Sequence, residues 1–91
     1  DGHAIKKGDM LALENGKLLF TDRELEKAVV KLVTRLCKRD SSFITLIHGE
    51  DVSEEEAAHI RDAVLDKLGD EIEIALINGG QPVYYFLISV E

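Results

Sequence analysis

The chain has 91 residues, of which 45% are hydrophobic and 32% charged, and its formal net charge is −7 at pH 7. A chain of this length and composition folds as one globular domain with one modest core, which leaves little room for a deep active site. The negative surface repels phosphate backbones and anionic lipids. Nucleic acid and an acidic membrane surface are therefore excluded as expected partners.

The cysteine content and the absence of targeting signals limit the possible location of the protein and the kinds of site that it can contain. Cys37 is the single cysteine, so an internal disulfide and a cysteine-based metal cluster are excluded, and the three histidines show no HxxxH or HxH spacing. The sequence contains no signal peptide and no apolar run of about 18 residues. We therefore expect a cytoplasmic protein with no metal site and no membrane insertion.

The chain opens with Asp1-Gly2-His3 and lacks an initiating methionine, which indicates a piece of a longer protein. We interpret residues 1–8 as a linker or a vector-derived remnant, and residues 9–91 as a single C-terminal α/β binding domain.

Residues 9–20 predict a β-hairpin. Asn15-Gly16 separates two apolar stretches, and both residue types accept the positive φ angles of a two-residue turn. Strands are expected at 9–14 and 17–20.

A helix is predicted over residues 22–38, with Thr21 or Asp22 as its N-cap. Its apolar stripe recurs at three- and four-residue steps and consists of Leu25, Val29, Leu32, Val33 and Leu36. The opposite stripe is basic and consists of Lys27, Lys31, Arg35 and Lys38. This stripe either docks an acidic partner or is an ordinary solvated face.

The second half of the chain predicts a strand, a helix and two further strands. Residues 43–48, FITLIH, form a continuous apolar run typical of a strand that is buried on both faces. Ser53 and Glu56 form a capping box at the start of a helix that Gly69 ends. Residues 71–77 and 83–90 predict the last two strands.

The predicted fold is a two-layer α/β (α+β) domain in the order β-β-α-β-α-β-β. We expect a single mixed sheet of about four to five strands with two helices on one face. The unit 43–77 predicts a right-handed crossover that joins parallel strands, and the strand at 83–90 then returns antiparallel.

Two loops form the candidate binding site. In the first, Gly79 and Gly80 let the backbone approach another group, Gln81 offers both a donor and an acceptor, and Pro82 follows. The alternative is a tight connector between strands. In the second, Glu50-Asp51 follows a buried strand, where ligands gather in α/β sheets. Its acidity favours a cation or a basic partner, or it serves helix capping and solubility.

Tyr84 and Tyr85 complete the candidate site. Successive strand residues face opposite sides, so Tyr85 is expected to point away from both Tyr84 and Phe86. At least one tyrosine hydroxyl is expected at the surface as an interface anchor. The alternative is ordinary strand packing.

The sequence contains no catalytic constellation. The motifs GxxxxGK[ST], GxGxxG and GxSxG are absent. His48 has no partner in the sequence for acid–base chemistry, and Cys37 is interpreted as a packing residue. We therefore assign no catalytic and no metal-binding residue.

Two long segments resemble the C-terminal part of one bacterial family. Residues 43–57, FITLIHGEDVSEEEA, are similar to its TLIYGEDVSEEEA segment, and residues 78–91, NGGQPVYYFLISVE, are similar to its GGQPxYYYxxSVE end. The family is the dihydroxyacetone-kinase-like catalytic subunit of fatty-acid kinase. The likeness covers residues 9–91, and Glu91 resembles the natural chain end. His48 stands where the family is expected to have a tyrosine, so no fixed chemical role follows for this position.

The resemblance implies a parent protein with an ATP-binding kinase domain, a middle domain with a Cys/His metal set, and this C-terminal domain. The parent phosphorylates the acyl carboxylate that a DegV-like fatty-acid-binding protein carries, for phospholipid synthesis. ATP and Mg²⁺ then belong to the separate kinase domain, and no cofactor is expected here. The carrier, the other parent domains and a second copy in a homodimer are the implied partners.

We therefore expect a non-catalytic docking module for the carrier. The expected contacts are Glu50, Asp51, Gly79, Gly80, Gln81, Pro82, Tyr84 and Tyr85. The alternatives are a regulatory domain whose two loops enclose a small molecule, and a structural or dimerisation domain of the kinase.

Overall fold

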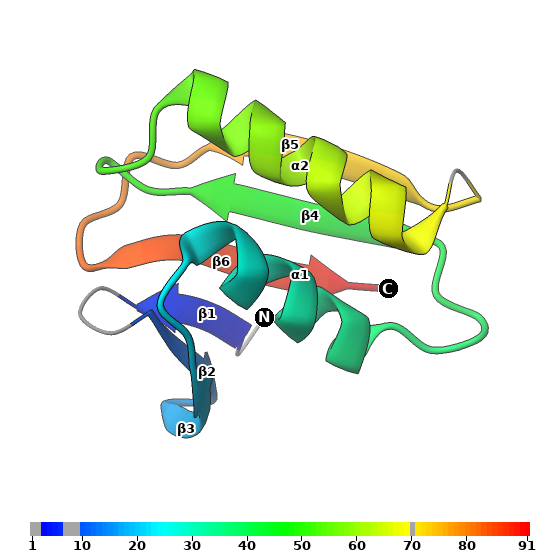
Figure 1. Cartoon of the computed structure of the whole chain (residues 1–91), viewed down its shortest axis with the longest axis horizontal. Helices are drawn as coiled ribbons and strands as arrows, with labels where there is room; N and C mark the ends of the chain where they lie inside the picture. Colours follow the sequence, from blue (N-terminus) through cyan, green and yellow to red (C-terminus); the bar gives the residue numbers. More distant parts are fainter. Residues whose placement is uncertain (1–2, 7–9, 70) are drawn as a thin grey trace.

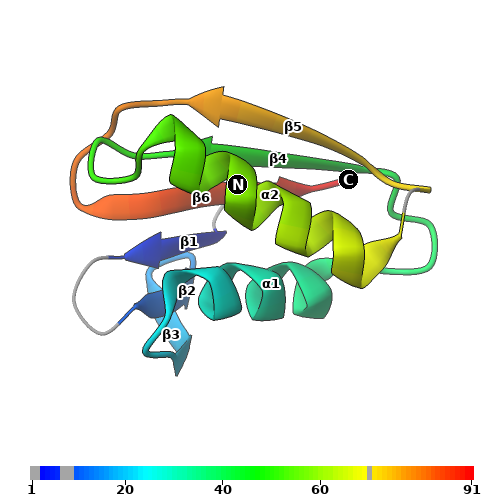
Figure 2. The ribbon, with the colours of Figure 1, turned by 45° about the horizontal axis from the view of Figure 1, so that its top comes forward.

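Two helices lie against one face of a mixed β-sheet in the computed structural model, which describes residues 3–6, 10–69 and 71–91 (Figure 1). The sheet has six strands in the order β3-β2-β1-β6-β4-β5. The elements are β1 (His3–Lys6), β2 (Leu11–Glu14), β3 (Lys17–Thr21), α1 (Leu25–Leu36), β4 (Phe43–His48), α2 (Glu54–Leu68), β5 (Glu73–Asn78) and β6 (Tyr84–Val90). The predicted class, with both helices on one face, is confirmed (Figure 2).

The sixth strand comes from the segment interpreted as a linker or remnant. His3–Lys6 pairs antiparallel with both β2 and β6, and Ile5 is completely buried. The linker interpretation is therefore wrong for residues 3–6, while residues 1, 2, 7 and 8 lie outside the described residues. A four-residue strand is too short to show a periodic pattern, and burial by its neighbours determines its structure.

The predicted hairpin turn, the Ser53 cap and the Gly69 helix end are confirmed. Asn15 and Gly16 adopt φ angles of 52° and 82°, as a two-residue hairpin turn requires. Ser53 Oγ accepts a hydrogen bond from the backbone N–H of Glu56 at 3.1 Å, and Gly69 ends α2 with a φ of 87°.

Helix α1 is shorter than the predicted 22–38 segment. Thr21 belongs to β3, and Asp22 Oδ1 accepts from the N–H groups of Arg23 and Glu24 in the turn before the helix. The hydrogen bond from Glu24 holds the pKa of Asp22 below its usual value. Asp22 therefore stabilises the turn that precedes α1. The N-cap residue of the helix is Glu24, whose side chain makes no capping hydrogen bond.

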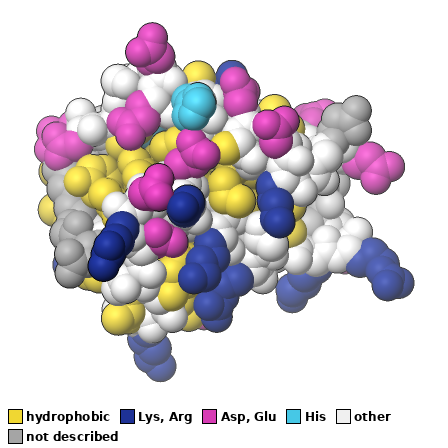
Figure 3. Space-filling model, viewed as in Figure 1, with side chains coloured by type: hydrophobic (Ala, Val, Ile, Leu, Met, Phe, Trp, Pro, Cys, Tyr) yellow, Lys and Arg dark blue, Asp and Glu magenta, His cyan; other side chains and the backbone are white. Residues whose placement is uncertain are grey.

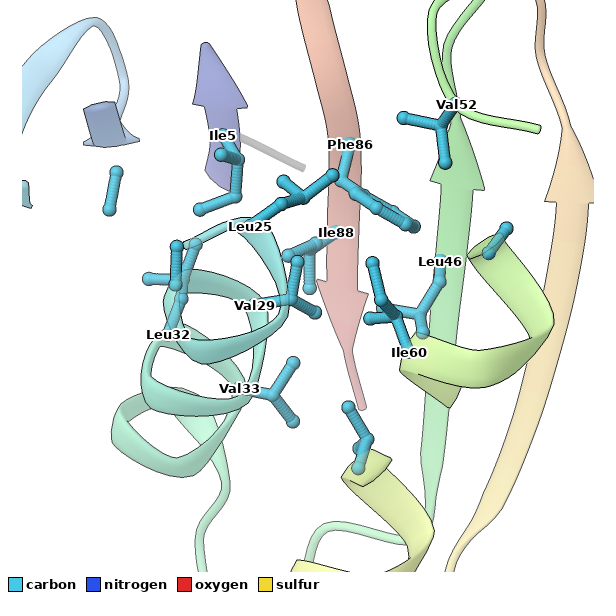
Figure 4. Close-up of a cluster of buried hydrophobic side chains, with 14 of the residues drawn as sticks. Ile5, Leu25, Val29, Leu32, Val33, Leu46, Val52, Ile60, Phe86 and Ile88 are labelled. Atoms are coloured by element: carbon cyan, nitrogen blue, oxygen red, sulfur yellow. The ribbon is translucent and has the colours of Figure 1, made fainter. Parts of the chain in front are cut away.

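The core lies between the helices and one face of the sheet (Figure 4). Val29 of α1 and Ile60 of α2 point toward the strands that carry Leu46 and Phe86 (Figure 4). Each of these four side chains is at most 1% exposed. Burial of this kind contributes about 1.5–3 kcal/mol for each large apolar side chain and is the main stabilising term.

Strand β4 is buried on one face, and not on both as its apolar sequence predicts. Ile44 and Leu46 are fully buried beneath the helices, whereas Thr45 and Ile47 are half-buried and Phe43 is exposed. No helix of the described residues covers this second side of the sheet, which we call the open face (Figures 1 and 2).

The last strand returns antiparallel as predicted, but it does not pair with β5. β4 and β5 are parallel neighbours, and β6 lies on the other side of β4, between β4 and β1. The segment that joins β5 to β6 must therefore cross the end of β4. This crossing brings the two predicted site loops together.

Candidate functional site

The loops after β4 and after β5 form one interlocked surface, at the left of Figures 1 and 2. The N–H of Glu50 donates to the carbonyl oxygen of Gln81 at 2.9 Å, and the N–H of Gly79 donates to that of His48 at 2.9 Å. The N–H of Gly49 donates to the carbonyl oxygen of Tyr85 at 2.8 Å. The structure thus unites the two loops that the sequence indicated separately.

Gln81 points into this junction and not toward solvent. Its Nε2 donates to the carbonyl oxygens of Ile47, at 3.1 Å, and of Tyr84, at 3.3 Å, and the residue is half-buried. Both of its amide hydrogens thus have partners inside the domain. Gln81 is a structural link between the loops, and its donors are not available to a partner protein.

Two glycines make the close approach of the loops feasible. A Cβ atom on Gly49 would overlap the carbonyl oxygen of Tyr84 and lie 2.7 Å from that of Gln81. A Cβ atom on Gly79 would overlap the Gln81 side-chain oxygen and the Ile47 side chain. The site prediction contains Gly79 but misses Gly49, because its signal, a glycine at the exit of a strand, is shared by many ordinary turns.

His48 also stabilises the junction of the two loops. Its side chain is 3% exposed, and Nδ1 lies 3.1 Å from the carbonyl oxygen of Val52. Because a carbonyl oxygen only accepts, Nδ1 carries the proton in this contact. The imidazole therefore holds the turn before α2 and faces the core.

The solvent-exposed side of the junction carries both acidic and apolar side chains. Glu50, Asp51, Pro82 and Val83 are all exposed. Val83 has a φ of 72°, and the N–H of Tyr84 donates to the carbonyl oxygen of Pro82 at 2.8 Å. This is a γ-turn of the rare positive-φ type, which costs a β-branched residue about 1–3 kcal/mol. No sequence signal marked Val83, because valine normally avoids this conformation.

Only part of the predicted alternation of Tyr84, Tyr85 and Phe86 is observed. A register shift separates the pairs Ile5–Phe86 and Lys6–Tyr84, so Tyr85 is an additional residue in β6. Tyr85 packs against the same buried cluster that contains Phe86, and the expectation that it points away from Phe86 is wrong. Tyr84 lines a shallow hollow of about 260 Å³ on the open face instead.

Three members of the basic stripe, Lys27, Lys31 and Arg35, line a groove of about 760 Å³ between α1 and α2, whereas Lys38 does not. Lys31 Nζ and Arg35 Cζ lie 4.7 Å and 5.6 Å from the centre of the Phe20 ring, so both cations cover an aromatic side chain. Lys27 pairs with Glu24 at 3.0 Å. Acidic residues also line the groove, and Figure 3 shows cations mainly toward α1 and anions mainly toward α2.

The described ranges contain neither a cluster of metal ligands nor a membrane-spanning helix. Within residues 3–6, 10–69 and 71–91, no three His, Cys, Asp or Glu side chains gather as metal ligands would. None of the helices there has the length and apolar character needed to cross a membrane.

Comparison with known proteins gives a consistent result. The FakA-like C-terminal family of fatty acid kinase matches residues 1–91. Protein YloV of Bacillus subtilis is 36% identical over 91 residues, and an uncharacterised protein of Staphylococcus haemolyticus is 33% identical over 91 residues. An uncharacterised protein of Staphylococcus aureus is 28% identical. Each match covers 100% of this chain but only 16% of the relative.

Proposed function

Since this chain belongs to the FakA-like C-terminal family of fatty acid kinase, we propose that it docks a DegV-like fatty-acid-binding protein. The family match describes a C-terminal module that is separate from the catalytic part of the kinase. The docked carrier then presents its acyl carboxylate to the kinase domain of the same polypeptide. ATP and Mg²⁺ act in that separate domain, and the acyl phosphate enters phospholipid synthesis in the cytoplasm.

The exposed γ-turn at Val83 is the observation that carries this proposal. The turn is strained, yet the glycine contacts and the Gln81 hydrogen bonds beneath it hold the loop in place. Strained backbone persists where the surrounding structure over-determines it, and such positions concentrate at functional sites. A rigid loop also loses little conformational entropy on binding, which favours affinity.

The chemistry of the surface fits an interface that forms and releases. Pro82 and Val83 offer a small apolar centre, and the Glu50 carboxylate lies on the adjoining loop. Transient interfaces combine an apolar centre with a polar rim in this way, and the rim charges select the partner and its approach. The matching surface on the carrier is an apolar patch beside a lysine or an arginine.

Affinity measurements with substituted chains test the surface. We expect Val83→Asp and Glu50→Lys each to weaken carrier binding by about tenfold or more, because each replaces a complementary group at the interface centre or rim. Asp40→Lys is the matched charge control, since Asp40 is exposed in the loop that precedes β4, at the opposite end of that strand. Equal affinities for all four chains, measured by biolayer interferometry, would contradict the proposed docking surface.

A further inference from the structure

One apolar residue from every strand forms a continuous row across the open face of the sheet. The register pairs Leu18 with Leu13, Leu13 with Ala4, Ala4 with Leu87, Leu87 with Ile47, and Ile47 with Ile77. At the usual spacing between strands the row is about 24 Å long. We call these six residues the apolar row.

The described residues leave five of the six residues of the apolar row at least partly uncovered, and Ala4 at its centre is 7% exposed. Leu18 is 58% exposed and Ile77 is 46% exposed at its two ends, and Leu13, Ile47 and Leu87 are half-buried. Phe43, on the same face, is 37% exposed. Three of the four exposed large apolar side chains in the described ranges thus lie on this face, and the fourth is Val83.

The centre of the apolar row is hollowed. Ala4 has a small side chain and lies between Leu13 and Leu87, and these three residues together with Tyr84 line the hollow of about 260 Å³. A hollow of this size accepts a protruding apolar side chain from a partner surface. The face therefore has both the composition and the shape of half an interface.

A free sheet face of this composition is unusual. Antiparallel sheets with one face in water normally place polar residues on that face, and parallel strand pairs such as β4 and β5 normally have cover on both sides. Contiguous exposed apolar surface on a soluble domain indicates an interaction site.

We propose that the apolar row packs permanently against an apolar surface of the polypeptide that precedes this domain in the same protein. The relatives that match this C-terminal domain have 84% of their length outside the 16% that it covers. A surface on the same chain is present at millimolar effective concentration and needs little intrinsic affinity. Permanent interfaces are as apolar as the interior of a domain, whereas an interface with a carrier that must be released is more polar.

This inference does not depend on carrier docking. The proposed docking residues Glu50, Pro82 and Val83 do not belong to the apolar row, although Ile47 of the row also contacts the junction of the two loops. If carrier docking fails experimentally, the apolar row still has to be covered.

Site-specific photo-crosslinking in the full-length polypeptide that carries this domain tests the proposal. The photoreactive residue p-benzoylphenylalanine replaces Leu18 or Ile77, whose exposed side chains make the change compatible with folding. The control places it at Glu55, which is exposed on α2. After irradiation, mass spectrometry identifies the linked peptides, and denaturing electrophoresis separates links within one chain from links between chains.

The proposal predicts links from positions 18 and 77, within one polypeptide, to peptides that precede this domain, and no such links from position 55. Links that join two open faces between chains would assign the row to a dimer and overturn the proposal. Links to the carrier alone, or no protein links at either position while the substituted protein remains folded by circular dichroism, would also overturn it.

Discussion

The side-chain nitrogen of Gln81 lies 3.1 Å from the carbonyl oxygen of Ile47, a residue 34 positions earlier in the chain. This hydrogen bond joins the last turn before β6 to the end of β4, because β6 returns beside β4 and not beside β5. The loops after β4 and after β5 are therefore held together at one junction. Their exposed residues form one surface.

Replacement of Gln81 should loosen this junction. Gln81→Ala removes two hydrogen bonds to backbone carbonyl oxygens, and we expect a loss of about 1–3 kcal/mol in the free energy of unfolding. Gln81→Glu should cost a similar amount, since a carboxylate cannot donate. Urea titration followed by circular dichroism measures both variants, with the exposed neighbour Asn78→Ala as the control. A stable Gln81→Ala variant would show that the hydrogen bonds contribute little.

Gly49 should tolerate no side chain. Gly49→Ala directs a methyl group at the backbone carbonyl oxygens of Gln81 and Tyr84, and we expect a loss of roughly 1–3 kcal/mol in the free energy of unfolding from overpacking. Gly16→Ala provides the contrast, because Gly16 has open space around its Cα and loses only the freedom of a φ of 82°. That substitution should cost about 1 kcal/mol. Thermal denaturation should show Gly49→Ala as the less stable variant, and the reverse order would contradict the close approach of the loops.

The Val83→Gly variant should be more stable than the Val83→Ala variant. Glycine adopts positive φ without steric cost, whereas alanine keeps the strain and also loses the valine side chain. The relief of about 1–3 kcal/mol opposes about 0.4–1 kcal/mol of added chain entropy in the unfolded state. We therefore predict that Val83→Gly melts at or above the temperature of the parent chain and that Val83→Ala melts below it. A Val83→Gly variant that is the least stable of the three would show that the γ-turn is not strained.

The sequence predicts the local features of this fold more fully than its long-range features. The Asn15-Gly16 turn and the Ser53 cap depend on residues a few positions apart, and both are confirmed. Strand β1 depends on partners at residues 11–14 and 84–88, which no local pattern reveals. The role of Gln81 and the exposed second face of β4 follow from the strand order, and a single sequence does not determine that order.

In the candidate site, too, the local features are predicted from the sequence and the long-range features are not. Turn residues are enough to identify the two loops, and the structure brings these loops together. The predicted alternation of Tyr85 and Phe86 fails because the register shift that adds a residue to β6 has no sequence signal. Val83 escapes prediction because strain is a property of the assembled junction.

Cys37 should react slowly with alkylating reagents. Partial burial raises the pKa of its thiol, so a smaller fraction of the reactive thiolate is present at neutral pH. The folded state favours the protonated thiol, and this contribution to stability is lost as the pH rises through the raised pKa. We expect iodoacetamide to modify the folded chain more slowly than the urea-unfolded chain at pH 8, with a rate that rises toward higher pH. Equal rates in the two states at pH 8 would contradict the shift.

Titration calorimetry of the 91-residue chain against the DegV-like fatty-acid-binding protein of the same organism tests the central claim most directly. The docking proposal predicts saturable heat with a micromolar or tighter dissociation constant, and a weaker constant for Val83→Asp. No heat, together with no co-elution of the two proteins in size-exclusion chromatography, would contradict the claim that this domain docks the carrier by itself.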